Sequence, residues 1–219
     1  MTIKFTGHLT LKLGAAWRSL DETNKRDVAQ QAEAVFAGRT TVLRGAYLTQ
    51  GYRADTDILL WMYGDSADDI QEAQLALRQT PLGRLAETPH AFMGVTLESE
   101  FNKSHVPAFI RGLDPLEYIC FYPFIRTPEW YLLPEDERRS LLAEHGVFGR
   151  EYPAVRTNNV HAFGLGDFEW LLSFETDDLV ELAQMVRRQR AAGARAFTKY
   201  EWPFIVGRRT GFAQALAKC

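Results

Sequence analysis

The stretch LLWMYGDSADDI at residues 59–70 returns in shortened form as LLSFETDDL at residues 171–179, and the two Asp-Asp pairs lie 109 residues apart. In each place an apolar run typical of a strand leads into polar residues that can begin a helix. Because both copies fall at the same step of their half of the chain, the repetition indicates an internal duplication.

Around the first copy, hydrophobic spacing and turn residues predict a β-α-β-β-α-β order. Apolar side chains at helical spacing follow Ser19–Glu22, which has the spacing of a capping box, and Ser66–Asp69 opens the second helix. The expected strands are residues 4–13, 40–50, 56–63 and 89–97.

The same order surrounds the second copy. Acidic residues after Pro134 predict a helix start, because negative charge is favourable at a helix N-terminus, and another helix follows Asp177. We therefore expect an α+β fold of two ferredoxin-like units (dimeric α+β barrel type), residues 1–104 and 105–219. The expected strands of the second unit are residues 117–126, 160–165, 168–174 and 200–206, where Pro203 favours an edge or a bulge.

The composition argues against several classes of protein. Of 219 residues 46% are hydrophobic, which is enough for a buried core, and the net charge of −3 argues against nucleic-acid binding. The sequence has neither an apolar run of about 20 residues for a membrane span nor the features of a signal peptide, so we expect a cytoplasmic protein. Its two cysteines, Cys120 and Cys219, form neither a disulfide framework nor a zinc motif. Phosphate-loop, dinucleotide and GxSxG motifs are absent, which removes the usual support for those functions.

Two histidines stand where an imidazole could do chemistry. His145 shares a face of its predicted helix with Leu141 and Phe148, so it is either a core histidine or a ligand to a group held under the helix. No second ligand stands at zinc or di-iron spacing, whereas a haem iron needs only one axial ligand from the chain. His105, in the polar connector between the halves, is either solvated or a proton acceptor.

The strand at residues 117–126 carries a phenol and a guanidinium. Tyr122 and Arg126 are four residues apart, so a regular strand puts both side chains on one face. An anionic ligand over that face would contact both, since arginine binds carboxylates through two hydrogen bonds. The alternatives are that Tyr122 packs in the core and that Arg126 is a solvated strand end. Trp130 and Tyr131, which follow, are expected in the core.

Three motifs, taken in order, resemble the chlorite dismutase-like superfamily. They are FYPFIRTPEWYLLPEDERRSLLAEHG at residues 121–146, GLGDFEWLLSFETDD at 164–178 and WPFIVGR at 202–208. Within the superfamily the chain most resembles the actinobacterial-type coproheme decarboxylases, which have the same short connection between Tyr-Pro-Phe and Trp-Tyr-Leu-Leu-Pro. The resemblance covers residues 105–208 well and the first hundred residues in element order more than in motif.

The resemblance implies roles for single residues. In the family's histidine–glycine pair His145 would be the axial ligand of the haem iron, and in its tyrosine–proline pair Tyr122 would form a radical. The connector histidine His105 would be the distal base, and Arg126 would contact a propionate. Trp170, which alone would be read as a core residue, would lie near the proximal side of the haem.

One position separates the decarboxylases from the chlorite dismutases, which place an arginine on the distal side of the haem. The segment after the His-Gly helix is one residue shorter here than in firmicute-type enzymes. We align Thr157 or Asn158 with the distal position, whereas a slip of one residue would place Arg156 there and turn its side chain to the other face. This alignment, with Tyr122 and His105 present, favours the decarboxylases.

The function that the resemblance implies is peroxide-dependent. Iron-coproporphyrin III (coproheme), both substrate and redox cofactor, would be decarboxylated on two propionates to haem b, the last step of the coproporphyrin-dependent haem pathway. A ring-shaped homo-oligomer, a pentamer, would carry haem only in the C-terminal half of each chain and meet the coproporphyrin ferrochelatase transiently. A chlorite dismutase or other haem peroxidase-like enzyme of the same fold, and a non-enzymatic haem-binding protein, remain as alternatives.

Overall fold

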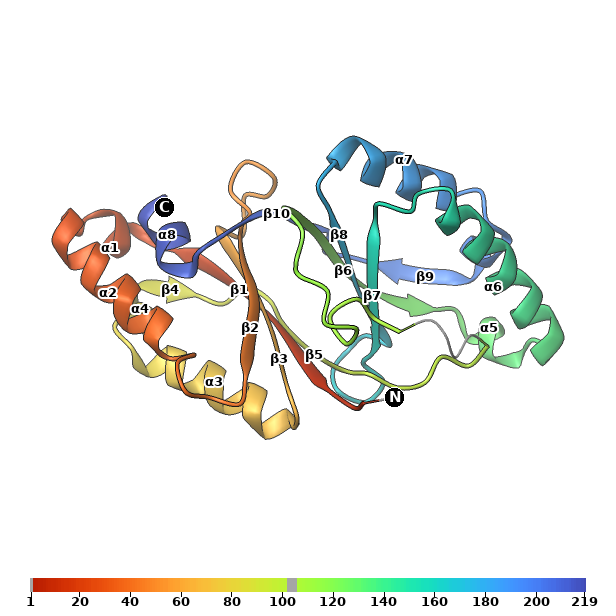
Figure 1. Ribbon diagram of the computed structural model, residues 1–219, viewed down its shortest axis with the longest axis horizontal. Helices are drawn as coiled ribbons and strands as arrows, with labels where there is room; N and C mark the ends of the chain where they lie inside the picture. The colour runs from red at the N-terminus through yellow and green to blue at the C-terminus, as the bar shows by residue number, and fades with distance from the viewer. Residues whose placement is uncertain (1, 102–105) are drawn as a thin grey trace. The chain divides into compact units, whose positions relative to one another are not determined.

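The computed structural model describes residues 2–101 and 106–219, and in it the chain folds as two compact units (Figure 1). The first unit combines residues 2–96 with residues 205–219, and the second lies within residues 97–204. Each unit has one antiparallel sheet with helices packed on it, and in each the elements follow the β-α-β-β-α-β order. The expected α+β fold of two ferredoxin-like units is confirmed.

In the first unit the strands lie in the order β10-β2-β3-β1-β5, and the short β4 pairs with the end of β1. The strands are β1 (Phe5–Leu13), β2 (Val42–Leu48), β3 (Ile58–Gly64), β4 (Ala86–Glu87), β5 (Ala91–Val95) and β10 (Ile205–Thr210). The helices are α1 (Ala15–Arg18), α2 (Glu22–Ala34), α3 (Ala67–Gln79), α4 (Leu82–Leu85) and α8 (Phe212–Ala217).

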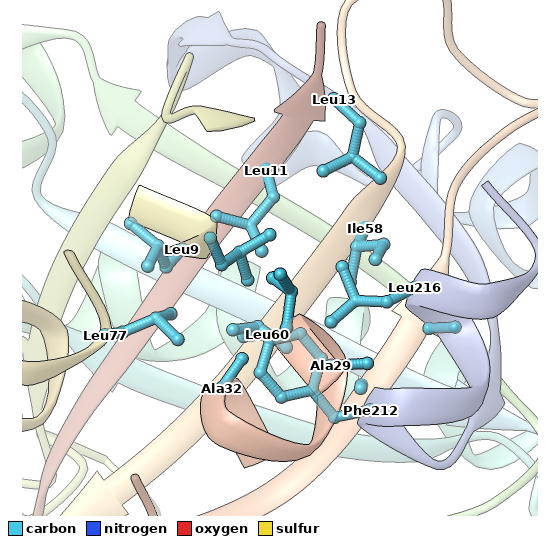
Figure 2. Close-up of a cluster of buried hydrophobic side chains, with 14 of the residues drawn as sticks. Leu9, Leu11, Leu13, Ala29, Ala32, Ile58, Leu60, Leu77, Phe212 and Leu216 are labelled. Atoms are coloured by element: carbon cyan, nitrogen blue, oxygen red, sulfur yellow. The ribbon is translucent and has the colours of Figure 1, made fainter. Parts of the chain in front are cut away.

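An apolar core fills the space between this sheet and its helices (Figure 2). Leu9, Leu11 and Leu13 of β1 point into it at every second position, as the period of a strand requires. The helices contribute the buried side chains of Ala29, Ala32, Leu77, Phe212 and Leu216.

The expected division at residues 104 and 105 differs from the units that form. The segment 205–219 belongs to the first unit, because β10 pairs with β2 and α8 buries Phe212 and Leu216 in the first unit's core. The single strand expected at residues 200–206 is in fact two strands, β9 (Thr198–Glu201) and β10, with Pro203 between them. Proline has no backbone N–H to donate to a ladder, so the pairing is interrupted there.

Replacing Phe212 with alanine is expected to lower the free energy of unfolding by about 3–5 kcal/mol, because a fully buried ring leaves a cavity. Urea unfolding measures the change. Leu75 of α3, 46% exposed, is the control, and its replacement by alanine is expected to cost about 0.5 kcal/mol. Equal unfolding midpoints for the two variants would show that α8 does not belong to this core.

Short polar side chains cap the starts of α2 and α3, though at α2 the cap is not the expected one. Ser66 and Asp69 form a capping box at α3, where the sequence predicts the start of a helix. The box predicted at Ser19–Glu22 is wrong, because Asp21 is the cap of α2 and its carboxylate accepts a hydrogen bond from the backbone N–H of Asn24 at 2.8 Å. An aspartate at this position satisfies a free N–H of the first turn without help from a serine.

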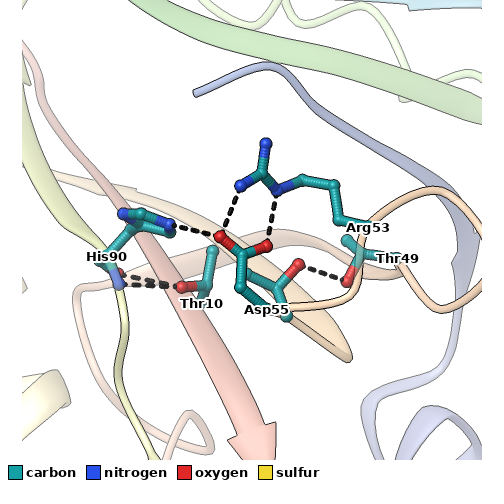
Figure 3. Close-up of polar contacts among 6 residues, drawn as sticks. Thr10, Thr49, Arg53, Asp55 and His90 are labelled. Carbon is teal, nitrogen blue, oxygen red and sulfur yellow. Dashed lines mark hydrogen bonds and ion pairs between the residues drawn. The ribbon is translucent and has the colours of Figure 1, made fainter. Parts of the chain in front are cut away.

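Polar contacts fix the loop between β2 and β3 (Figure 3). Asp55 accepts hydrogen bonds from Arg53, at 2.7 Å from Nε, and from His90 Nε2 at 3.3 Å. The bond from Arg53 is the main reason that the pKa of Asp55 falls to about 2. The backbone N–H of His90 also donates to the Thr10 hydroxyl at 3.0 Å, so this histidine has a structural role.

The second unit has the strand order β7-β8-β6-β9. Its strands are β6 (Tyr118–Arg126), β7 (Arg156–His161), β8 (Trp170–Thr176) and β9. Its helices are α5 (Pro128–Leu132), α6 (Glu135–Arg150), α7 (Leu179–Gln189) and the 3₁₀ turn η1 (Gly193–Phe197). All the residues singled out by the resemblance lie in this half of the chain.

Candidate functional site

The register of β6 and β8 gathers a phenol, aromatic rings and a guanidinium on one face of the second sheet. Tyr122 pairs with Leu172 and Phe124 with Trp170, and paired residues of an antiparallel ladder project to the same face. The Arg126 guanidinium lies 5.1 Å over the Phe124 ring. The prediction that Tyr122 and Arg126 share a face is confirmed, and we call this surface the Tyr122 face.

Tyr122 is half-buried among other rings. Its ring stacks on Phe204 at a centroid distance of 4.2 Å and lies 5.9 Å from that of Phe174. Burial, with smaller effects of Cys120 and Glu201, raises the pKa of Tyr122 above its ordinary value. The side chain is therefore a protonated phenol at neutral pH and has an O–H hydrogen to lose.

Arg126 is held in place and is not a solvated strand end. Its Nη1 donates to the carbonyl of Ala194 at 2.8 Å, and its guanidinium lies 4.4 Å over the ring of Trp130. Its backbone N–H donates to Glu169 Oε2 at 2.8 Å. Burial lowers the pKa of Arg126, yet a guanidinium stays charged at neutral pH. Since the side chain carries five N–H donors, it can also bind a carboxylate.

Further rings extend the Tyr122 face at its Trp170 end. Trp170 stacks on Phe124 at 6.1 Å, and its ring lies 4.3 Å from His161 and 5.6 Å from Phe163. Phe163 is 46% exposed and Tyr131, expected in the core, is 38% exposed. This much exposed aromatic surface is suited to a flat apolar ligand.

Helix α6 carries His145, which is half-buried, and no residue of this helix is fully buried. Its Val147 is 48% exposed. A methyl group added to Gly146 would meet only Arg150 Nη1, at an ordinary 3.5 Å. A glycine inside a helix costs about 1 kcal/mol relative to alanine, and packing within the chain does not explain it here. A glycine therefore stands beside His145 at a position where the chain itself would accept a side chain.

Contacts from α7 and η1 fix the turn of α6 that carries His145. Gln189 Nε2 donates to the His145 carbonyl at 3.2 Å, and the backbone N–H of Gly193 donates to Glu144 Oε2 at 2.7 Å. Because Ala194 of the same 3₁₀ turn accepts the bond from Arg126, one segment ties both the histidine helix and the Tyr122 face.

An ion pair also connects α6 and α7. Arg188 Nε and Nη2 donate to the two carboxylate oxygens of Glu151, each at 2.9 Å, and the guanidinium lies 3.3 Å over the ring of Phe148. A two-bond contact of this kind restricts sliding of α6 along α7.

The register of β7 answers which residue stands on the Tyr122 face. Thr157 pairs with Phe174, so it projects to that face, whereas Arg156 and Asn158 project to the other. The Arg156 guanidinium donates to the carbonyl of Asp114. Of the two residues aligned with the distal position, only Thr157 lies on the Tyr122 face.

Asn158 has a structural role on the opposite face. It accepts a hydrogen bond from the backbone N–H of Phe109 at 3.0 Å and donates to Glu175 at 3.1 Å. These bonds attach the end of the connector to the sheet. His105, proposed above as the distal base, lies outside the described residues.

Sequence reasoning missed a group of charges at the end of this face. Glu201 pairs with Phe124 and so projects to the Tyr122 face, where its two carboxylate oxygens bind Arg190 and Arg195. The only signal in the sequence was an acidic residue within an expected apolar strand.

Within residues 2–101 and 106–219, no three histidine, cysteine, aspartate or glutamate side chains gather as they would around a metal ion. In the same part of the chain no helix is long and apolar enough to cross a membrane. The residues present fit an iron porphyrin instead, because its iron needs one imidazole, its ring needs an apolar face and its propionates need cations.

Comparisons with known proteins support this assignment. The family model "Chlorite dismutase" matches residues 24–210. A coproheme decarboxylase of Mycolicibacterium smegmatis is 44% identical over 178 residues, which cover 81% of this chain and 77% of that protein. A crystal structure of a mutant chlorite dismutase from Candidatus Nitrospira defluvii, in complex with cyanide, superposes with a TM-score of 0.88 at 18% identity and covers 98% of this chain and 94% of that one. The same enzyme in complex with imidazole gives 0.88 at 19% identity, with the same coverage.

Proposed function

The chain belongs to the chlorite dismutase family, and we propose that it is the enzyme of that family that decarboxylates coproheme oxidatively to haem b. The observation that carries the proposal is the placement of Tyr122 and Arg126 on one aromatic sheet face. An oxidisable phenol beside a carboxylate-binding guanidinium is what the removal of a propionate carboxylate needs. The 44% identity to a coproheme decarboxylase supports the same conclusion.

We assign the holding of coproheme to three residues. His145 would ligate the iron from α6, Arg126 would bind a propionate carboxylate through paired hydrogen bonds, and the ring of Trp170 would contact the macrocycle. When bound, the iron porphyrin supplies the centre that reacts with hydrogen peroxide and takes up electrons. The chain positions it and handles the protons.

Tyr122 performs the step at the propionate. The phenol loses one electron and its proton, and its oxygen then takes a hydrogen atom from the β-carbon of the propionate, which restores the O–H. The substrate radical gives up a second electron and releases carbon dioxide, so that a vinyl group remains. For each propionic acid group, one hydrogen peroxide is reduced by these two electrons, and the products are one vinyl group, one carbon dioxide and two waters.

The side of the sheet to which Arg156 projects argues against chlorite dismutation, which is the main alternative reaction. At the strand position aligned with the distal arginine of that reaction, Thr157 lies on the Tyr122 face, whereas Arg156 projects to the other side and binds the Asp114 carbonyl.

The test of the proposal is the mass of the porphyrin after anaerobic loading with coproheme and stepwise addition of hydrogen peroxide. Two successive losses of one carbon dioxide and two hydrogens are expected. Oxygen release from chlorite without such losses would identify a chlorite dismutase. Binding with neither reaction would identify a haem-binding protein.

We propose His105 as the proton acceptor for hydrogen peroxide, a role that rests on the resemblance alone. Replacing His105 with alanine should leave coproheme binding intact and slow the reaction with peroxide by about 10²–10⁴-fold, the usual contribution of a general base. Stopped-flow absorption measures the rate. His90, which is bonded to Asp55 in the first unit, is the control, and its replacement by glutamine should not change that rate.

The assembly and location follow from the resemblance as proposals. We propose a cytoplasmic homopentamer, with one coproheme per chain in the unit within residues 97–204. Coproheme would arrive through transient contact with the coproporphyrin ferrochelatase. Sedimentation of the purified protein tests the pentamer.

A further inference from the structure

The group formed by Arg190, Glu201 and Arg195 joins three elements of the second unit at the Tyr122 face. Arg190 follows α7, Arg195 lies in η1, and Glu201 ends β9 opposite Phe124. Arg195 Nη1 lies 2.8 Å from Glu201 Oε2, and Arg190 Nη1 binds the other oxygen. One carboxylate therefore holds two guanidiniums side by side.

The charges and the exposure of this group suit a second anion. Two guanidiniums and one carboxylate leave one net positive charge. The Glu201 side chain is 16% exposed, whereas those of Arg190 and Arg195 are 40% and 35% exposed. Glu201 is thus the fixed member, and the two arginines keep N–H donors that an incoming carboxylate can reach.

The group also lies close to the reacting phenol, because Glu201 pairs with Phe124, which is two residues from Tyr122 on the same face of β6. The charge of Glu201 raises the pKa of Tyr122, and those of Arg190 and Arg195 lower it. Arg195 also acts on the pKa of Arg126, whose Nη1 binds the carbonyl of the neighbouring Ala194. A ligand whose carboxylates reach Tyr122 and Arg126 would therefore bring a carboxylate within range of this pair.

We propose that Arg190 and Arg195, held by Glu201, form a second carboxylate-binding pair beside Tyr122, and that this pair makes the site prefer a porphyrin with four carboxylates to one with two. The proposal rests on the proposed function, because the substrate has four propionates and the product two. The carboxylates that the reaction removes are those that Tyr122 reaches. The pair therefore holds substrate and loses its ligand when product forms, which favours product release.

The test compares the affinities of two metal-free porphyrins, so that the bond between iron and His145 does not contribute. Replacing Arg195 with glutamine should weaken binding of coproporphyrin III by about 10- to 100-fold, the value of a hydrogen bond between charged groups. Binding of protoporphyrin IX, with two carboxylates, should weaken less than about threefold. Arg190→Gln should act in the same direction. Fluorescence titration gives both dissociation constants on one preparation.

Arg187 of α7 supplies the matched control, because it is an exposed arginine three residues before Arg190. Arg187→Gln should change neither constant. Arg195→Lys keeps the charge and much of the packing, and it should lose part of the preference for coproporphyrin III. This variant replaces Arg195→Gln in the test if the glutamine variant does not fold. An equal loss for both porphyrins, or the same loss in Arg187→Gln, overturns the proposal.

The experiments distinguish failure of the proposal on Arg190 and Arg195 from failure of the proposed function. If the wild type converts coproheme with peroxide and the ratio of the two constants does not change in Arg195→Gln, the pair has no part in selectivity. If the ratio changes but coproheme is not converted, the role of the pair in selectivity is supported and the proposed reaction is wrong.

Discussion

Replacing His145 with alanine is expected to weaken coproheme binding by at least about 100-fold and to change the absorption spectrum of what remains bound. Changes to the partners of a metal ligand already cost about 10- to 100-fold in metal affinity, so loss of the ligand itself should cost at least as much. The effect should be specific to iron, since α6 is fixed by Gln189 and by Glu144, and neither contact uses the imidazole. Absorption titration measures both quantities.

Metal-free coproporphyrin III is the sharper control for this variant. It cannot use an axial ligand, so its affinity should be the same in His145→Ala and in the wild type. Val147→Ala, an exposed change two residues along α6, should leave the affinity for coproheme unchanged. An unaltered coproheme spectrum in His145→Ala would show that His145 is a core histidine.

Local signals in the sequence predicted the longer helices and most strands of both units, whereas the strand expected at residues 160–165 is β7 at Arg156–His161. The two-residue period of Leu9, Leu11 and Leu13 predicted β1, and the polar pair Ser66 and Asp69 predicted the start of α3. These signals act over a few residues, where backbone geometry alone relates sequence to structure. The capping box predicted at Ser19 does not form, because the Ser19 hydroxyl donates to the carbonyl of Ala16 and Asp21 caps α2 instead.

Long-range pairing could not be predicted in this way. The apolar spacing of Phe212 and Leu216 is compatible with a helix, but nothing near them in the sequence indicates which sheet they cover. Likewise, whether Arg156 or Thr157 lies on the Tyr122 face depends on a register that one residue reverses.

The candidate site shows the same difference between local signals and long-range pairing. Tyr122 and Arg126 could be predicted to share a face, because they lie on one strand. Glu201 could not be linked to Arg190 and Arg195, because their contact depends on how β9, α7 and η1 fold back together. Ion pairs between elements follow no periodic pattern in the sequence, so they could not be predicted from it.

Replacing Tyr122 with phenylalanine is expected to lower formation of haem b by about 100-fold or more, with coproheme affinity unchanged, which is the pattern for loss of a group used only in the transition state. Phenylalanine keeps the ring that stacks on Phe204, so the fold and the sheet face should persist. What is lost is the O–H, and a phenyl ring has no comparable hydrogen to give up and regain. Because burial raises the pKa of Tyr122, the wild-type rate should not fall near pH 10, where a free tyrosine ionises.

Product mass after stepwise peroxide addition measures the loss, because each decarboxylation removes one carbon dioxide and two hydrogens. Tyr200→Phe is the matched control: this tyrosine is exposed on β9 and pairs with Ile125, so its side chain projects away from the Tyr122 face. The Tyr200→Phe variant should form haem b at the wild-type rate. Trp130 lies against Arg126 and is also oxidisable, so a small residual rate in Tyr122→Phe is compatible with the assignment. Haem b formed by Tyr122→Phe at the wild-type rate would instead make Tyr122 a packing residue and require another group to take the hydrogen from the propionate.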